Sequence, residues 1–307
     1  MDSIANALAG CALLEPQSFA HLQLFPLVLP GDRPAGYVVL DDALAVGTFL
    51  LTEVSESASV GDLRAQNQGD LPVLLIDGEE VVGAKQNRVF NLSILVPAGA
   101  TEVIPVSCVE AGRWRHQSSS FAAAEHAEYP SARAARNMQV SESLRSMEGP
   151  RSDQREVWRE IHEKAGRMAS RSETGAMHDI YEQHRSGIDG YAAAFRALPF
   201  QAGGAFVISG RPVGVELFDS PATFARILPK LVRSYALDAI EAAPSPGLAT
   251  ERLLNAFLAA VSEANVETFP TVGAGEMLRL SGDGVTGSAL QEADRIVHLA
   301  AFASPVR

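Results

Sequence analysis

Residues 71–97, LPVLLIDGEEVVGAKQNRVFNLSILVP, place acidic and amide side chains between two apolar segments. LPVLLI and VFNLSILVP are rich in aliphatic and β-branched residues, which is typical of buried β-strands. Asp77-Gly78, between Ile76 and Glu79, predicts a two-residue turn of the primed type, because both residues tolerate a positive φ. The stretch therefore predicts a β-hairpin whose returning strand begins apolar and becomes polar toward its far end.

The rest of the first third continues this pattern of short apolar segments, separated by turn signals such as GDRP, QNQGD and PAGA. Connections this short favour antiparallel pairing, because parallel strands need a long crossover. A helical turn is expected at residues 40–47. Strands are expected at residues 25–30, 37–40, 49–54, 62–67, 71–76, 79–84, 92–97 and 102–109.

Helical periodicity appears in the middle of the chain. Residues 153–170 predict a helix with Asp153 as its N-cap, and residues 177–198 predict a second helix that glycines interrupt. Residues 114–150 lack regular periodicity and are interpreted as a long connection. The last third predicts a hairpin around Ser209-Gly210, then two amphipathic helices at 220–243 and 247–264, and at least two strands within 277–302.

These elements predict an α+β fold: an antiparallel β-sandwich or partly open barrel, with a central helical insertion and C-terminal helices that return to the sheet. Late strands would rejoin the main sheet, so residues 1–307 are expected to form a single composite domain. Its parts would be a β-rich segment at 24–112, a helical insertion at 113–200, and a hairpin, two helices and terminal strands at 201–307.

Composition and charge exclude several classes of protein. The chain has 307 residues, of which 47% are hydrophobic and 20% charged, an ordinary globular composition. No apolar run approaches the roughly 18 to 20 residues that cross a bilayer. Without a basic leader, and with only two cysteines, the chain is expected to be a cytoplasmic protein. The net charge is −12, and residues 1–112 hold 14 acidic and 4 basic side chains, which argues against nucleic-acid binding.

Lys85, Gln86, Asn87 and Arg88 supply two cations and two amides in four consecutive residues. Such a donor set is suited to an anionic ligand. The alternative is a polar strand end whose side chains hold a loop by hydrogen bonds. The residue types alone do not separate these two interpretations.

Glu110, Arg113 and Trp114 follow the expected strand at 102–109. Glu110 and Arg113 can pair with each other or with residues 85–88, and Trp114 can stack on a flat ring. The alternative is a structural ion pair below a core tryptophan. Cys108 is interpreted as a small buried hydrophobe.

Glu79 and Glu110 are weak candidates for a catalytic base. Carboxylates beside a tight turn, such as those of Glu79 and Glu80, are usually solvated. The helical histidines His162, His178 and His184 lack the spacing of a zinc motif, so no metal site is expected.

Several stretches carry a resemblance to a known family. They are GEEVVGAKQNR (78–88), LVPAGATEVIPVSCVEAGRW (95–114), REVWREI (155–161), AFVISGRPVGVELFDSPATF (205–224) and LPKLVRSYALDA (228–239). Over roughly residues 24–243 the chain resembles the ARG and Rhodanese-Phosphatase-superfamily-associated Protein domain family. The family is named for its association with ADP-ribosylglycohydrolases and rhodanese-phosphatase proteins, which implies a setting in ADP-ribose or NAD metabolism. The resemblance implies no reaction, cofactor or catalytic residue.

The sequence therefore supports a binding domain of unknown reaction. Residues 85–88 and the Glu110–Trp114 turn would line one pocket for an anionic, nucleotide-like small molecule. Two alternatives stay open. One is a hydrolase that acts on such a ligand, with Glu79 or Glu110 as base. The other is a protein-interaction scaffold that uses the helical middle of the chain as its interaction surface. A homo-oligomer is one version of this alternative.

Overall fold

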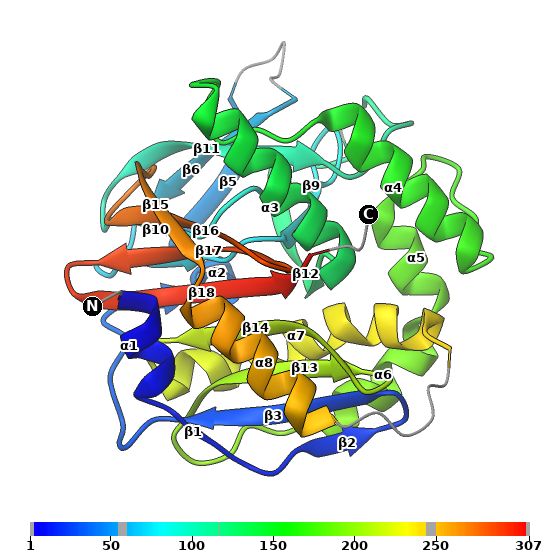
Figure 1. The fold of residues 1–307 in the computed structure, drawn as a ribbon. Helices are drawn as coiled ribbons and strands as arrows, with labels where there is room; N and C mark the ends of the chain where they lie inside the picture. Colours follow the sequence, from blue (N-terminus) through cyan, green and yellow to red (C-terminus); the bar gives the residue numbers. More distant parts are fainter. Residues whose placement is uncertain (1–2, 55–59, 116, 244–249, 305–307) are drawn as a thin grey trace.

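The computed structural model describes residues 3–54, 60–115, 117–243 and 250–304. Within these residues it contains eight helices and eighteen strands (Figure 1). Strand pairing is antiparallel except between β4 and β7. The expected α+β class with antiparallel sheets is confirmed.

The largest sheet has nine strands and is built from both ends of the chain. Eight of them follow the order β1-β3-β13-β14-β18-β17-β16-β15, and β2 pairs with β3. The expected turn at Ser209-Gly210 joins β13 to β14, and both residues have positive φ, as in a primed turn. The strands are β1 Ala12–Leu13, β2 Gln17–Phe19, β3 Leu22–Val28, β13 Gln201–Ile208, β14 Arg211–Phe218, β15 Asn265–Pro270, β16 Glu276–Gly282, β17 Val285–Glu292 and β18 Arg295–Ala303.

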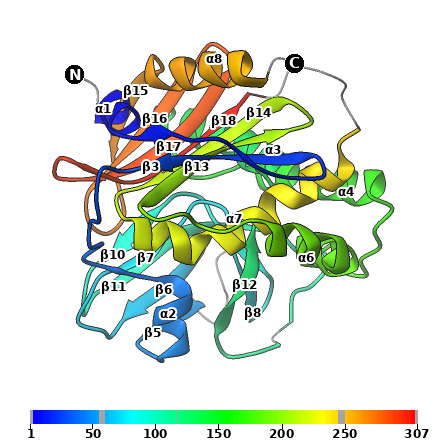
Figure 2. The ribbon, with the colours of Figure 1, turned by 90° about the horizontal axis from the view of Figure 1, so that it is seen from below.

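A six-stranded sheet of order β12-β8-β9-β11-β6-β5 forms the second β-unit. Its two edge strands, β5 and β12, contact each other, so the sheet curls into a half-barrel (Figure 2). Its strands are β5 Phe49–Glu53, β6 Asp62–Asn67, β8 Glu79–Gly83, β9 Arg88–Phe90, β11 Thr101–Cys108 and β12 Phe121–Ala127. A three-stranded sheet lies beside it, made of β4 Val38–Val39, β7 Val73–Leu75 and β10 Ile94–Val96.

Of the expected helices, α4 and α7 begin close to the residues that the sequence indicates. Asp153 caps α4, because its side chain accepts hydrogen bonds from the backbone N–H groups of Arg155 and Glu156. Pro221 occupies the first turn of α7. No helix in the described ranges is long and apolar enough to span a bilayer. The helices are α1 Ser3–Ala9, α2 Leu40–Ala45, α3 Pro130–Arg145, α4 Gln154–Arg167, α5 Met177–Gln183, α6 Arg185–Ala194, α7 Pro221–Glu241 and α8 Thr250–Ser262.

Several expectations about local structure are wrong or only partly right. The segment 114–150 contains β12 and α3 and is not a long connection. The helical stretch 177–198 breaks at His184, between α5 and α6, and not at a glycine. The helix expected at 247–264 is α8, and residues 247–249 lie outside the described residues.

The turn at Asp77-Gly78 also differs from expectation. Glu79 N donates to Ile76 O, so the turn itself forms, but only Gly78 has a positive φ (79°). It therefore lacks the primed geometry, and it connects β7 and β8, which lie in different sheets. A side chain at Gly78 would collide with Arg133, whose Cδ lies 2.7 Å from an ideal Cβ.

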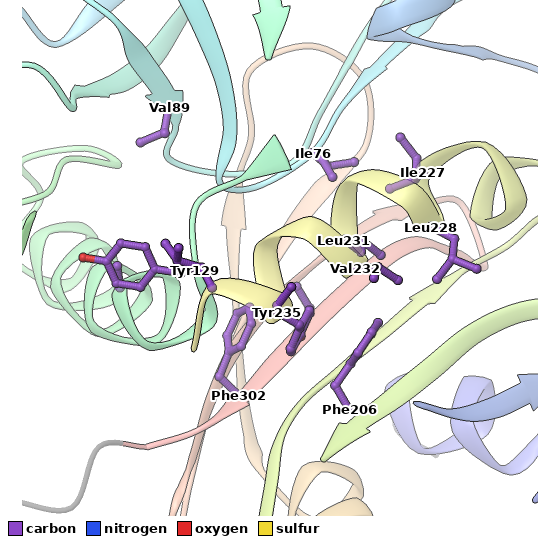
Figure 3. Packing of buried hydrophobic residues seen from close by; sticks show 14 of the residues in the cluster. Ile76, Val89, Tyr129, Phe206, Ile227, Leu228, Leu231, Val232, Tyr235 and Phe302 are labelled. Atoms are coloured by element: carbon purple, nitrogen blue, oxygen red, sulfur yellow. The ribbon is translucent and has the colours of Figure 1, made fainter. Parts of the chain in front are cut away.

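Helix α7 packs between the nine-stranded sheet and the half-barrel, while α1 and α8 cover the opposite face of that sheet (Figure 2). Alternating residues of β13 serve the two faces, because Phe206 faces α7 and Ala205 faces α8. The Phe206 ring stacks on Tyr235 of α7 at 3.7 Å between centroids. Figure 3 shows this packing, with the apolar side of α7 directed at Phe206 and Phe302. A separate apolar core fills the half-barrel.

Candidate functional site

The loop between β8 and β9 carries the polar residues of the opening stretch. Residues 79–88 form two strands and a turn instead of one long strand, because Gly83 (φ 124°) and Ala84 (φ 40°) reverse the chain. Gly83 N donates to Asn87 Oδ1 at 3.3 Å and closes the loop. A side chain at Gly83 would lie 2.6 Å from Ser118 Oγ, so this turn requires glycine.

Antiparallel pairing of β9 with β11 joins the two predicted groups of residues. Cys108 lies opposite Arg88, and the contact continues beyond the strands, where Val109 N donates to Asn87 O at 3.1 Å. The next residue, Glu110, therefore lies beside the loop. Gln86 Nε2 donates to Glu110 O at 2.8 Å. The convergence expected from the sequence is thus present, and we call residues 85–88, 110, 113 and 114 the loop cluster.

Glu110 and Arg113 form an ion pair inside the loop cluster. Arg113 Nε donates to Glu110 Oε1 at 2.8 Å and Arg113 Nη2 donates to Oε2 at 2.6 Å. Arg113 Nη1 also donates to Ala84 O at 2.8 Å. Burial alone would raise the pKa of Glu110, but hydrogen bonds from Arg113, Thr174 and the Asn87 N–H outweigh it and lower that pKa. Both carboxylate oxygens are bonded, so Glu110 holds the loop in place.

Arg88 is the exception in this well-bonded cluster. Its Nη1 donates to Gln86 Oε1 at 3.1 Å, whereas Nε and Nη2 are buried and have no hydrogen-bond partner. Burial lowers the pKa of Arg88, because it removes the charged guanidinium from water. Trp158 Nε1, on α4, is a further buried donor without a partner. Helix α4 packs against β11, where Gln154 Nε2 donates to Cys108 O at 2.7 Å.

Cys108, as expected, is fully buried, and burial raises the pKa of its thiol. Its Sγ donates to Glu110 O at 3.3 Å. A protonated thiol in these surroundings behaves as a small hydrophobe.

Trp114 brings the loop cluster to the surface. Its side chain is 49% exposed, so it is not a core tryptophan, and Lys85 Nζ lies 5.6 Å from its ring centroid. Gln86, Asn87 and Arg113 are buried. Three cavities of about 610, 560 and 630 Å³ lie near Asp219, near α2, and between α3 and β16, and none of the three is lined by the loop cluster.

Glu79 and Glu80 are both fully buried, which corrects the expectation that they are solvated. Glu79 Oε1 accepts from Lys230 Nζ at 2.5 Å, and burial raises the pKa of Glu79. Glu80 Oε2 lies 2.5 Å from His126 Nε2. Burial alone would raise the pKa of Glu80, but His126 and His178 outweigh it and lower that pKa. Carboxylates beside a turn are usually solvated, but this turn is buried between two β-units. Glu79 and Glu80 are therefore buried with it.

Glu80, His126 and His178 form a compact group that we call the histidine cluster. They lie on β8, β12 and α5, and one ligand atom from each lies within 4.8 Å of the other two. His178 Nδ1 lies 3.8 Å from Glu80 Oε2. The sequence gives no signal for this group, because its members are 46 or more residues apart and match no known spacing of metal ligands.

A network of buried charges on α3 was also missed. Arg133 Nη1 donates to Glu216 Oε1 at 2.5 Å, and Arg136 Nη1 lies 3.1 Å from Asp77 Oδ1. His298 Nε2 lies 3.0 Å from Glu216 Oε2. These side chains join the half-barrel to the nine-stranded sheet. The signal in the sequence is the spacing of Arg133 and Arg136, three residues apart on one helical face.

Comparison with known proteins adds one finding. The model of the ARG and Rhodanese-Phosphatase-superfamily-associated Protein domain matches residues 10–302. No curated protein and no solved structure matches the chain.

Proposed function

The chain belongs to the ARG and Rhodanese-Phosphatase-superfamily-associated Protein domain family, and we propose that it binds an anionic, nucleotide-like ligand at the loop cluster. The observation that carries this proposal is the buried Arg88 guanidinium, with Nε and Nη2 lacking hydrogen-bond partners. An unpaired buried donor costs about 1–3 kcal/mol. A phosphate or carboxylate group would accept from both nitrogens in the bidentate geometry that arginine favours.

Trp114 and Lys85 suit the rest of such a ligand. The half-exposed Trp114 ring offers a flat face for a base, and the Lys85 ammonium lies beside that ring. Arg88 itself is closed to solvent. Binding at Arg88 must therefore displace some of the side chains that cover it. The association of the family's name with ADP-ribose chemistry makes ADP-ribose and NAD the first ligands to test.

The first prediction concerns ligand binding by three variants. Lys85→Ala and Arg88→Met should weaken ADP-ribose binding by about ten-fold or more, because each removes a charged donor to the anionic group. Trp114→Ala should weaken ADP-ribose and uncharged adenosine alike, because stacking does not depend on the phosphates. Calorimetric titration measures each affinity, and a thermal-shift series measures the accompanying rise in Tm.

Phe200→Ala is the matched control, because Phe200 is as exposed as Trp114 (49%) and lies outside the loop cluster. If no anionic nucleotide raises the Tm of the wild-type chain, or if the three variants bind as the wild type does, the proposal fails.

The hydrolase alternative can be tested with the same samples. Glu110 is bonded through both oxygens and Glu79 is paired with Lys230, so each has a structural partner that a base would have to release. Incubation with ADP-ribose or NAD, followed by chromatography, measures product. Product formation that Glu110→Gln abolishes while binding persists would favour the enzyme over the binding domain.

A further inference from the structure

We propose that the histidine cluster, Glu80, His126 and His178, is a binding site for a divalent transition-metal ion of the Zn²⁺ class. Two imidazoles and one carboxylate are a common ligand set for such ions in proteins. Three protein ligands leave at least one coordination position for water or a substrate group. The proposal involves none of the residues of the loop cluster, so it does not depend on the proposed ligand.

Two buried atoms of the cluster lack hydrogen-bond partners. Glu80 is fully buried, and its Oε1 has no hydrogen-bond partner. His178 Nδ1, which faces Glu80, also lacks one. A buried carboxylate oxygen without a partner is costly, and a cation held by the Glu80 carboxylate and the His178 imidazole would give both groups a partner.

The distances in the cluster fit an ion after a small adjustment. Metal–ligand bonds of about 2.1 Å place two ligand atoms of one ion at most about 4.2 Å apart. His178 Nδ1 and Glu80 Oε2, which are 3.8 Å apart, already lie within that limit. The 2.5 Å contact between His126 and Glu80 must lengthen, because the ion takes the place of the proton that the two atoms share. His178 is the part that can move, since its side chain is 29% exposed.

Neighbouring side chains hold the two imidazoles. The Tyr181 ring stacks on His126 at 3.5 Å between centroids, and Tyr181 Oη donates to Ala127 O at 2.8 Å. Glu182 Oε1 lies 3.7 Å from His178 Nε2, on the side of the ring away from Glu80. Carboxylates in this position commonly orient a ligating histidine. An irregularity in the pairing of β12 with β8, between Ala123 and Ala127, places His126 beside Glu80.

The second prediction measures metal content directly. The purified chain is stripped with a chelator and dialysed against Zn²⁺, and it should then bind about one Zn²⁺ ion. The variants His178→Ala and Glu80→Gln should bind Zn²⁺ at least ten-fold more weakly. Mg²⁺ should not compete, because it prefers oxygen ligands. Elemental analysis gives the stoichiometry, competition with a chromophoric chelator gives the affinity, and the visible spectrum of the Co²⁺-loaded chain reports imidazole ligation.

His162→Ala is the matched control, because His162 is an exposed histidine on α4 outside the cluster. It should bind Zn²⁺ as the wild type does. His178→Ala is the decisive variant, since the partly exposed position of His178 should preserve the fold, which far-UV circular dichroism checks. If the wild-type chain binds no stoichiometric Zn²⁺, or His178→Ala binds it with unchanged affinity, the site does not exist. Nucleotides are absent from this assay, so its failure leaves the ligand proposal unaffected.

Discussion

Arg88 and Arg113 lie in the same cluster, yet their guanidinium groups have very different surroundings. Arg113 uses its nitrogens on Glu110, Asn87 and the carbonyl of Ala84. Arg88 has a partner for Nη1 and none for Nε and Nη2. A fully paired buried charge is costly to disrupt, whereas a half-paired one already carries part of that cost in the folded state.

The third prediction compares Arg113→Met with Arg88→Met in urea unfolding. Arg113→Met should lower the free energy of unfolding by about 3–5 kcal/mol, because it leaves the Glu110 carboxylate buried without its partner. Arg88→Met should change it by only about 1 kcal/mol, because the lost hydrogen bonds from Nη1 to Gln86 Oε1 and Asn87 O are offset by the removal of two unsatisfied donors. Equal losses in the two variants would mean that Arg88 is fully bonded in solution, and would remove the main support for the ligand site.

At the scale of elements, α3 is a helix that the apolar periodicity of the sequence does not predict. Half of its eight buried residues are polar, namely Arg133, Arg136, Asn137 and Ser141. A search for apolar residues at helical spacing finds no stripe there. The helix is stable in this position because acidic residues of other elements, Asp77 and Glu216 among them, pair with its arginines.

The fourth prediction tests the contribution of this network. Arg133→Met should lower the free energy of unfolding by about 3–5 kcal/mol, since Glu216 and Asp77 lose a buried cation. The matched control is Arg159→Met on α4, whose pairs with Glu156 and Glu163 lie at the surface. That substitution should change stability little. A small effect of Arg133→Met would show that the buried pairs are replaceable by packing alone.

At the scale of the whole molecule, the chain is assembled from distant segments. The strands of the nine-stranded sheet come from residues 12–28 and 201–303, and the strands of the half-barrel lie within residues 49–127. Helix α7 contacts β13 on one side and β12 on the other. Lys230 of α7 reaches Glu79 of the half-barrel at 2.5 Å. These contacts are the physical basis for expecting a single composite domain.

The fifth prediction follows from that arrangement. Both β-units should lose protection from hydrogen exchange at the same urea concentration, because unfolding either one exposes the apolar face of α7 and uncovers the buried ion pairs. Mass spectrometry of peptides from 62–67 and 201–208 measures the two units separately. If the half-barrel peptide exchanges first, at clearly lower urea, the chain consists of two cooperative units.

Much of the local structure could be predicted from the sequence alone. The N-cap Asp153, Pro221 in the first turn of α7 and the Ser209-Gly210 hairpin act through neighbours within a few residues. Most strands of the first third were expected near their observed positions for the same reason, since alternation and turn residues are local signals. The meeting of residues 85–88 with Glu110 was a hypothesis based on residue types, and the pairing of β9 with β11 is what brings them together.

Only the tertiary structure decided which of these polar residues are buried and what they pair with. Residues 79–88 form two strands because the chain reverses at Gly83 and Ala84, and Ser118 and Ser120 leave no room for a side chain at Gly83. Glu80 meets His126 and His178 only after three elements have packed. Local periodicity and capping depend on sequence neighbours, whereas the burial and pairing of a charge depend on residues far away in the chain. The sequence by itself therefore determined most elements of this protein, and packing determined its candidate chemistry.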